Sequence, residues 1–478
     1  MTFFHKKFFW GGLSTFLLLL AVSFVYLPSL WADPVPDQAV EAPRPKNYNQ
    51  ALQSFMDFVQ TRYVDDVDSQ ALFEGALKGM LDSLGDPYTL YLDEKEYRIL
   101  TDTTTGEFGG VGLFINKKPP GETPSLVPED RFVVVVLPIE NTPGAKSGLM
   151  TGDLITKIDG QSTEELDIEA AQKRIRGKPG TTVTLNILRG ASWEFEVVLT
   201  RAQIEIPTVK TALLEGDLGY IQLLNFTDHT PERVEEALKG FMDSQAKGLI
   251  LDVRSNPGGL LTAVIRILDL FFSDGILVST KGRTPSDNQV AMAEPGQLVP
   301  DNIPVMVLIN GDSASASEIL AGGFKDRRRG FLLGEKTFGK GSVQQVLPFG
   351  RTAFKITTAR YYTPADITPD KVGVAPHQEM KVPVMSEVDL QIFKKLLQEK
   401  KLESAAKDLK GVDDPRIMDA VASLIKEEFT LEPRILKRLL QDEVRKLKNL
   451  PQPATDTEFD LVLKEALRLF KAGEVVVP

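Results

Sequence analysis

The chain has 478 residues and a formal net charge of −11. This length predicts several domains with an ample hydrophobic core. The acidic balance, with no basic patch interleaved with aromatic residues, argues against nucleic acid as a partner. There is no cysteine and there are three histidines, His5, His229 and His377. A cysteine nucleophile is therefore excluded, and a Ser–His–Asp triad is hard to supply.

The N-terminus is predicted to direct export. His5-Lys6-Lys7 is a basic lead, and residues 8–27 carry no charge. A signal-peptide core spans about 7–15 residues and a membrane helix about 20, so this length favours an uncleaved anchor. Against that, Leu30-Trp31-Ala32 fits a cleavage site. The preceding basic residues place the bulk of the chain outside the cytoplasm, in the periplasm or cell envelope. If residues 8–27 remain, they anchor it to the inner membrane.

A proline-rich linker is predicted over residues 33–46, after the export segment at 1–32. A helical segment then follows over residues 47–105. It carries two apolar stripes at helical spacing. Their members are Leu52, Phe55, Met56 and Val59, and then Leu72, Ala76, Leu77, Met80, Leu81 and Leu84.

Residues 106–201 look like a PDZ domain. The segment Gly109-Gly110-Val111-Gly112-Leu113 resembles the loop and strand that receive a peptide's terminal carboxylate. Successive glycines expose backbone N–H groups to an anion, and the following strand edge can pair with a peptide. The insertion at 117–130 puts the shape of the groove in doubt. Arg176 is interpreted either as a link to the active site or as a solvated arginine.

Residues 202–384 alternate strands and helices and predict an α/β domain. A strand at 218–223 precedes a helix at 232–243 and a buried strand at 247–253. The turn Arg254-Ser-Asn-Pro-Gly-Gly259 follows, and then another helix begins. A glycine turn between a strand and a helix is either a site of backbone donors or an ordinary tight turn.

The most informative segment follows an apolar strand at 305–309 and a turn at 310–312. Ser315-Ala-Ser-Glu318 has capping-box spacing, with apolar residues at helical spacing behind it. A serine at this junction would point out of the core, near free N–H groups that could hold an oxyanion. The alternative is that Ser313, Ser315 and Ser317 are only caps.

Lys340 strengthens the catalytic interpretation. Residues 342–347 fit a strand, which would place Lys340, Ser342 and Gln344 on one face. A lysine base has to be neutral, so its pKa must fall from ~10.4 toward ~7–8 by burial. Gln344 could orient the amine through a hydrogen bond. A solvated surface lysine is the alternative.

Residues 385–478 are predicted to be helical and highly charged. Such helices cannot bury their apolar stripes alone, so they pack on the core or on a partner. A homodimer and a monomer are both compatible with this pattern. The stripes are Val388, Ile392, Leu396 and Leu397; then Ile417, Val421, Leu424 and Ile425; then Leu461, Lys464 and 467–470.

Two motifs together resemble those of carboxyl-terminal processing peptidases, serine endopeptidases with a Ser–Lys dyad and an embedded PDZ domain. They are Ser313-Ala-Ser-Ala-Ser-Glu-Ile-Leu-Ala-Gly322 and Thr337-Phe-Gly-Lys-Gly-Ser-Val-Gln344. The resemblance covers nearly the whole chain. It implies a crotonase-like α/β peptidase core with an inserted PDZ domain and helical N- and C-terminal segments. In related members, C-terminal segments support dimers.

The resemblance also implies roles for individual residues. The nucleophile falls on Ser315, the general base on Lys340 and the orienting glutamine on Gln344. The oxyanion hole falls on the backbone of Ala316 together with that of Gly258 or Gly259. No metal and no cofactor is implied.

The predicted function is that of an exported serine endopeptidase that recognises free protein C-termini through its PDZ domain. Its expected partners are protein or peptide substrates, and the membrane if the N-terminal segment stays uncleaved. One alternative is a catalytically silent PDZ scaffold, against which the intact Ser–Lys–Gln set argues. Another is a crotonase-like enzyme acting on small thioesters, which has no evident use for a PDZ domain or for export.

Overall fold

The computed structural model describes residues 47–118, 131–190, 192–382, 385–448, 450, 453 and 455–475. The predicted export segment, the linker at 33–46 and most of the 117–130 insertion lie outside these residues. Within the described ranges, no helix combines the length and apolar character needed to cross a membrane. The chain forms two compact units, Met1–Leu77 and Lys78–Pro478.

The first unit contains the helical segment that the sequence predicts. Helix α2 spans Tyr48–Arg62, and α3 spans Ser69–Asp82 and crosses the boundary between the units. The side chain of Asn47 accepts hydrogen bonds from the backbone N–H groups of Asn49 and Gln50, which caps α2. Neither helix has a buried residue.

The central sheet of the second unit has six strands. Its first pair is antiparallel and every later pair is parallel. Parallel sheets are normally covered on both faces, which explains the continuous apolar runs of the central strands. The strand order is β10 (Val209–Leu214), β11 (Leu218–Leu223), β12 (Gly248–Asp252), β15 (Val305–Ile309), β16 (Phe331–Gly334) and β19 (Gln378–Glu379).

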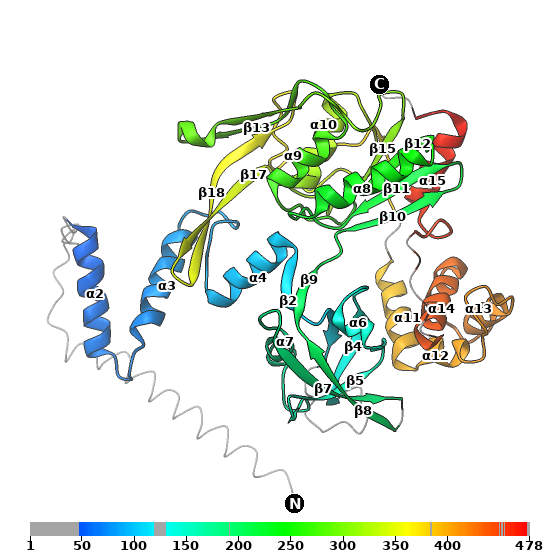
Figure 1. Ribbon diagram of the computed structural model, residues 1–478, viewed down its shortest axis with the longest axis horizontal. Coiled ribbons are helices and arrows are strands. Elements are labelled where there is room, and N and C mark those ends of the chain that lie inside the picture. The colour runs from blue at the N-terminus through cyan, green and yellow to red at the C-terminus, as the bar shows by residue number, and fades with distance from the viewer. Residues whose placement is uncertain are drawn as a thin grey trace, which may run out of the picture. The chain divides into compact units, whose positions relative to one another are not determined.

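Both faces of this sheet are packed by helices. Val305, Val307 and Ile309 of β15 join the cluster formed with α8 (Thr230–Asp243), α9 (Leu261–Asp269) and α10 (Ala316–Asp326). The alternate residues Met306 and Leu308 face α15 (Leu461–Ala472) instead, as the two-residue period of a strand requires. Figure 1 shows α15 in red, on the C-terminal part of the chain. Burying each such side chain contributes about 1.5–3 kcal/mol.

A second, five-stranded sheet brings the segment after α3 next to the core. Strand β1 (Leu90–Leu92) pairs with β18 (Thr352–Tyr362), with Leu90 opposite Lys355. Strand β17 (Ser342–Phe349) pairs with the same β18. The remaining strands are β13 (Ile276–Gly282) and β14 (Gln289–Met292), separated by the short helix η2 (Pro285–Asp287).

The PDZ region forms its own antiparallel sheet around a separate core that includes Val111, Ile155 and Leu185. Helix α4 (Glu94–Thr105) precedes it, and a two-stranded ribbon of β2 (Glu107–Gly110) and β9 (Ala202–Glu205) joins its two ends to the rest of the unit. Its other elements are β3 (Leu113–Asn116), β4 (Val133–Pro138), α6 (Pro143–Lys146), β5 (Leu154–Ile158), β6 (Gln161–Ser162), α7 (Ile168–Ile175), β7 (Thr182–Arg189) and β8 (Trp193–Thr200).

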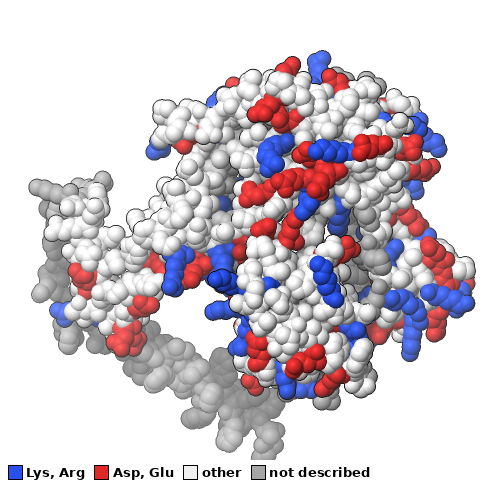
Figure 2. Space-filling view, in the orientation of Figure 1, with Lys and Arg blue, Asp and Glu red and all other residues white. Residues whose placement is uncertain are grey.

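The C-terminal helices divide into two groups. Four of them bury their apolar stripes against one another, around Leu396, Val421 and Leu440, whereas α15 packs on the central sheet. Helices α12 and α14 lie within the segment predicted to be helical, but the sequence analysis assigned no apolar stripe to either. On the face drawn in Figure 2, acidic and basic side chains are interspersed. The four helices are α11 (Glu387–Gln398), α12 (Lys401–Ala406), α13 (Ile417–Lys426) and α14 (Pro433–Lys448).

Candidate active site

The candidate nucleophile lies where β15 turns into α10, as the sequence predicts. Ser315 is the N-cap of α10 and has φ 55° and ψ −114°. A non-glycine residue with positive φ is uncommon and costs about 1–3 kcal/mol. The turn is therefore held in place by its surroundings, and such strain often accompanies functional sites.

The three serines of the cluster differ in their surroundings. Ser313 and Ser317 are fully buried. The Ser313 hydroxyl donates to the Val253 carbonyl at 2.8 Å, and the Ser317 hydroxyl donates to the Asn256 carbonyl at 2.9 Å. Both serines therefore tie the turn of the candidate nucleophile to the segment 253–259. Ser315 is the partly exposed member of the three.

Glu318 joins the nucleophile turn to the lysine segment, and the sequence did not reveal this. Its carboxylate is fully buried. Oε2 accepts from the backbone N–H of Ser315 at 2.9 Å and from that of Lys340 at 2.8 Å. Oε1 accepts from the Thr337 hydroxyl at 2.6 Å and from the Gly339 N–H at 2.8 Å. One oxygen atom thus holds the backbones of both predicted dyad residues.

The environment of the Lys340 amine disfavours its charged form. Burial lowers the pKa of Lys340, and Lys355 lowers it further, while Asp86 and Glu318 act in the opposite direction. Nζ lies 4.7 Å from the ring centroid of Tyr88. Among the described residues it has no hydrogen-bond or ion-pair partner. A half-buried lysine with a lowered pKa is the kind of group that general-base catalysis requires.

The amide nitrogen of Gln344 donates to two hydroxyl groups, while its predicted hydrogen bond with the Lys340 amine stays a prediction. Strand β17 begins at Ser342, after Lys340, and an irregularity in its pairing falls between Val343 and Gln344. The simple alternation that would align Lys340 with Gln344 therefore does not apply. The Gln344 amide donates to the Ser342 hydroxyl at 2.8 Å and to the Thr357 hydroxyl at 3.3 Å.

The two glycines predicted for the oxyanion hole differ in what their N–H groups do. A Cβ on Gly258 would lie 2.7 Å from Cβ of Ser315 and 3.0 Å from the Ala316 nitrogen, so this close approach requires glycine. The Gly258 N–H donates to Asn256 Oδ1 at 2.9 Å. The N–H groups of Gly259 and Ala316 donate to no other described residue. The structure thus leaves Gly259 and Ala316 available as donors.

The described histidines lie elsewhere. His229 Nε2 lies 2.7 Å from Glu107 Oε1, and His377 Nδ1 accepts from the Leu332 N–H at 2.8 Å. Across the part of the chain that the structure covers, no group of three or more His, Cys, Asp or Glu side chains could hold a metal ion.

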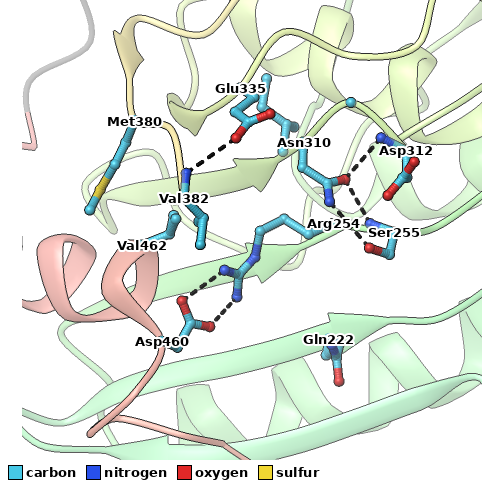
Figure 3. Close-up of a pocket in the computed structure, with 12 residues that line it drawn as sticks. Gln222, Arg254, Ser255, Asn310, Asp312, Glu335, Met380, Val382, Asp460 and Val462 are labelled. Atoms are coloured by element: carbon cyan, nitrogen blue, oxygen red, sulfur yellow. Dashed lines mark hydrogen bonds and ion pairs between the residues drawn. The ribbon is translucent and has the colours of Figure 1, made fainter. Parts of the chain in front are cut away.

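A crevice of about 450 Å³ opens beside this site, at the carboxyl ends of the central strands (Figure 3). Arg254 crosses it and pairs with Asp252, and with Asp460 at the start of α15. Asp252 is fully buried, and Arg254 is 17% exposed. Neither Ser315 nor Lys340 lines the crevice. Arg254 thus links the start of α15 to the turn that carries Gly258 and Gly259, the glycines predicted for the oxyanion hole.

The predicted peptide-binding residues divide between the β2–β9 ribbon and the free edge of the PDZ sheet. Strand β3 is an edge strand and pairs with β4. The N–H groups of Val111 and Gly112 donate to no other described residue, but both residues are buried, Val111 completely. The Val111 side chain packs in the PDZ core. Leu113 is half-buried, whereas Gly109 and Gly110 belong to the β2–β9 ribbon.

Arg176 lies at the C-terminus of α7 and contacts α4. Its Nη1 is 2.5 Å from Asp102 Oδ2, and its guanidinium lies over the Phe108 ring at 4.4 Å. Arg176 is thus paired rather than simply solvated. Helix α4 in turn contacts β1 and β18.

Comparison with known proteins identifies the class. Residues 217–380 match Peptidase family S41, residues 32–96 match the activating protease CtpB N-terminal domain, and residues 134–189 match a PDZ domain. The fold and these matches define a serine-type peptidase with a PDZ domain. The chain belongs to peptidase family S41 and, within it, to the carboxyl-terminal processing peptidases. The predicted family, fold class and enzyme class are confirmed.

The relatives support this assignment over most of their length. A carboxy-terminal-processing protease of Bartonella bacilliformis is 38% identical over 356 residues, which cover 73% of this chain and 79% of that protein. A carboxyl-terminal-processing protease of Synechocystis sp. is 37% identical over 317 residues, with coverages of 65% and 71%. The carboxy-terminal processing protease CtpA of Bacillus subtilis is 31% identical over 327 residues, with coverages of 68% and 67%.

Proposed function

We propose that this peptidase uses a dyad of Ser315 and Lys340, and that it acts outside the cytoplasm on proteins whose free C-terminus the PDZ domain captures. The observation that carries the dyad is the Glu318 carboxylate, whose Oε2 binds the backbone N–H of both residues. The half-buried Lys340 amine has the lowered pKa that a base requires.

The proposed chemistry needs a neutral lysine. Ser315 Oγ attacks the scissile carbonyl carbon while its proton passes to Lys340 Nζ. The N–H groups of Ala316 and Gly259 stabilise the oxyanion. Collapse of the intermediate breaks the C–N bond, and the Lys340 ammonium returns the proton to the leaving amine. Water, deprotonated by Lys340, then hydrolyses the acyl-enzyme and regenerates Ser315.

Substitution of the serines tests the assignment. With an unfolded protein as substrate, Ser315→Ala should lose activity by at least about a thousandfold while remaining folded. Ser313→Ala should retain catalysis but lose stability, because its hydroxyl is a buried tie. An active Ser315→Ala protein would refute the nucleophile. Peptide binding without any cleavage by the wild-type protein would favour a PDZ scaffold.

The pH dependence tests the base. The active form carries neutral Lys340, so kcat/KM should rise as pH increases through the Lys340 pKa, which burial lowers below the usual lysine range. Lys340→Arg should be inactive throughout, because arginine stays protonated. Appreciable activity in Lys340→Arg would refute a proton-accepting role.

Location and assembly are parts of the same proposal. The basic lead and uncharged residues 8–27 support export, with membrane anchoring if the segment stays uncleaved. Fractionation of cells, with detection of the chain in the cell envelope, tests export. Sedimentation of the purified protein tests the homodimer.

A further inference from the structure

A short turn that follows α3 covers the candidate base. The Asp86 carboxylate accepts from the Tyr88 N–H at 3.0 Å and from the Thr89 hydroxyl at 2.7 Å. Thr89 is almost completely buried, and its hydroxyl accepts from the Thr357 N–H of β18 at 3.1 Å. The turn is therefore fixed internally by Asp86 and fixed to β18 by Thr89.

This anchoring determines where the Tyr88 ring lies. The ring sits over Lys340 Nζ, with 4.7 Å between Nζ and the ring centroid. The Tyr88 phenol hydroxyl makes no hydrogen bond with another described residue. The aromatic face is thus the part of Tyr88 that meets the amine. A ring in this position attracts the charged form of a lysine and also limits its contact with water.

The other charged groups that act on the Lys340 amine come from three elements. Lys355 belongs to β18, Asp86 to the turn itself and Glu318 to α10. Gln344 donates to the Thr357 hydroxyl, and the Thr357 N–H holds Thr89. The turn, β18 and the predicted orienting glutamine thus form one hydrogen-bonded assembly around the amine.

We infer that Tyr88 is a positioning residue for the peptidase reaction: its ring, seated by Asp86 and Thr89, holds the Lys340 amine in place and sets its proton affinity. The inference rests on the proposed role of Lys340 as the base. Tyr88 lies far from both sequence motifs, and the inference adds it to the residues that position the dyad.

The test compares three substitutions of Tyr88. Tyr88→Leu keeps an apolar cover but removes the aromatic face, so the acidic limb of kcat/KM should move about half a unit to one unit toward lower pH. Tyr88→Ala removes the cover, so kcat should fall about tenfold with KM within about twofold. Its acidic limb should move to higher pH, because water reaches the ammonium. Tyr88→Phe keeps the ring, so the acidic limb of its kcat/KM profile should coincide with that of the wild type.

Tyr97 offers a matched control, because it is a partly buried tyrosine of α4 with no contact to Lys340. Tyr97→Leu should leave the acidic limb unchanged. A second readout avoids turnover altogether. In Ser315→Ala protein, the pH dependence of Lys340 modification by an amine-reactive reagent, followed by mass spectrometry, should shift in the same direction on adding Tyr88→Leu.

The outcomes separate this inference from the proposed function. If Lys340→Ala is inactive but Tyr88→Leu keeps the wild-type limb and the wild-type modification profile, the positioning role is wrong and the dyad stands. If Lys340→Ala stays active, the dyad itself is wrong. Should Tyr88→Ala fail to fold, the Leu and Phe variants still decide the question.

Discussion

Glu318 is the residue on which the arrangement of the candidate dyad depends. Its buried carboxylate accepts four hydrogen bonds, two at each oxygen, from segments that are far apart in the sequence. A carboxylate suits this position because it is purely an acceptor and each oxygen can take two donors. Any neutral replacement leaves a buried donor without its partner.

Glu318→Gln should therefore be damaging although the two side chains have the same shape. Whichever way the amide turns, its NH₂ group faces at least one backbone N–H. We expect a loss of roughly 3 kcal/mol in the free energy of unfolding. We also expect a fall of about a hundredfold in kcat, because Ser315 and Lys340 lose their common anchor. Circular dichroism in urea and single-turnover kinetics measure the two effects.

Asp312→Asn is the control for this substitution, since Asp312 is an exposed carboxylate on the same turn. It should leave both stability and kcat near the wild-type values. A Glu318→Gln protein with wild-type kcat would contradict the anchoring role.

At the scale of elements, local sequence patterns were sufficient to predict individual strands and helices. They were not sufficient to predict contacts between segments that are distant in the sequence. The predicted strand at 305–309 and the helix after Ser315 match β15 and α10 because turn, cap and apolar spacing are all local signals. The capping-box spacing also indicated that Glu318 meets the Ser315 backbone. Its contact with Lys340 depends on tertiary packing, and so does the placement of Tyr88. No spacing rule connects such separate segments.

An ion-paired aspartate at the start of α15 adds to the apolar packing that holds this helix on the central sheet. Asp460 accepts from the Leu463 N–H at 2.9 Å and pairs with Arg254, whose guanidinium is mostly buried. Asp460→Ala should cost roughly 3 kcal/mol, because it removes a helix cap and leaves Arg254 with Asp252 alone. Limited proteolysis should then release α15, and kcat should fall because Arg254 begins the turn that carries Gly259.

Glu458→Ala is the matched control in the same segment. Glu458 forms an exposed ion pair with Lys437, and exposed pairs contribute little. Its digestion pattern should match that of the wild type. An Asp460→Ala protein with an equally resistant α15 would show that the apolar contacts of the helix suffice to hold it.

At the scale of the whole molecule, peptide binding to the PDZ domain can affect the peptidase core only through the contacts that connect the two. Covalently, the PDZ domain joins the core through the β2–β9 ribbon. Arg176 adds a contact from α7 to Asp102 of α4, and α4 touches β1 and β18. Strand β18 pairs with β17, which carries Gln344. We expect peptide bound along β3 beside α7 to act on the active site through α4 only if this contact has two arrangements.

A substrate comparison tests this coupling. A long unfolded substrate with a free, apolar C-terminus should be cut several-fold faster than the same chain ending in an amide, because the backbone N–H groups of a PDZ carboxylate-binding loop favour an anion over an amide. Tethering alone raises the local concentration of substrate at the active site.

If Arg176 also transmits binding, Arg176→Ala should reduce the advantage of the free carboxylate while leaving peptide affinity, measured by calorimetry, unchanged. Arg174→Ala, on the same helix, should keep the full advantage. Equal rates on both substrates with the wild-type protein would overturn C-terminal recognition, whereas an unchanged advantage in Arg176→Ala would leave tethering as the whole effect of the PDZ domain.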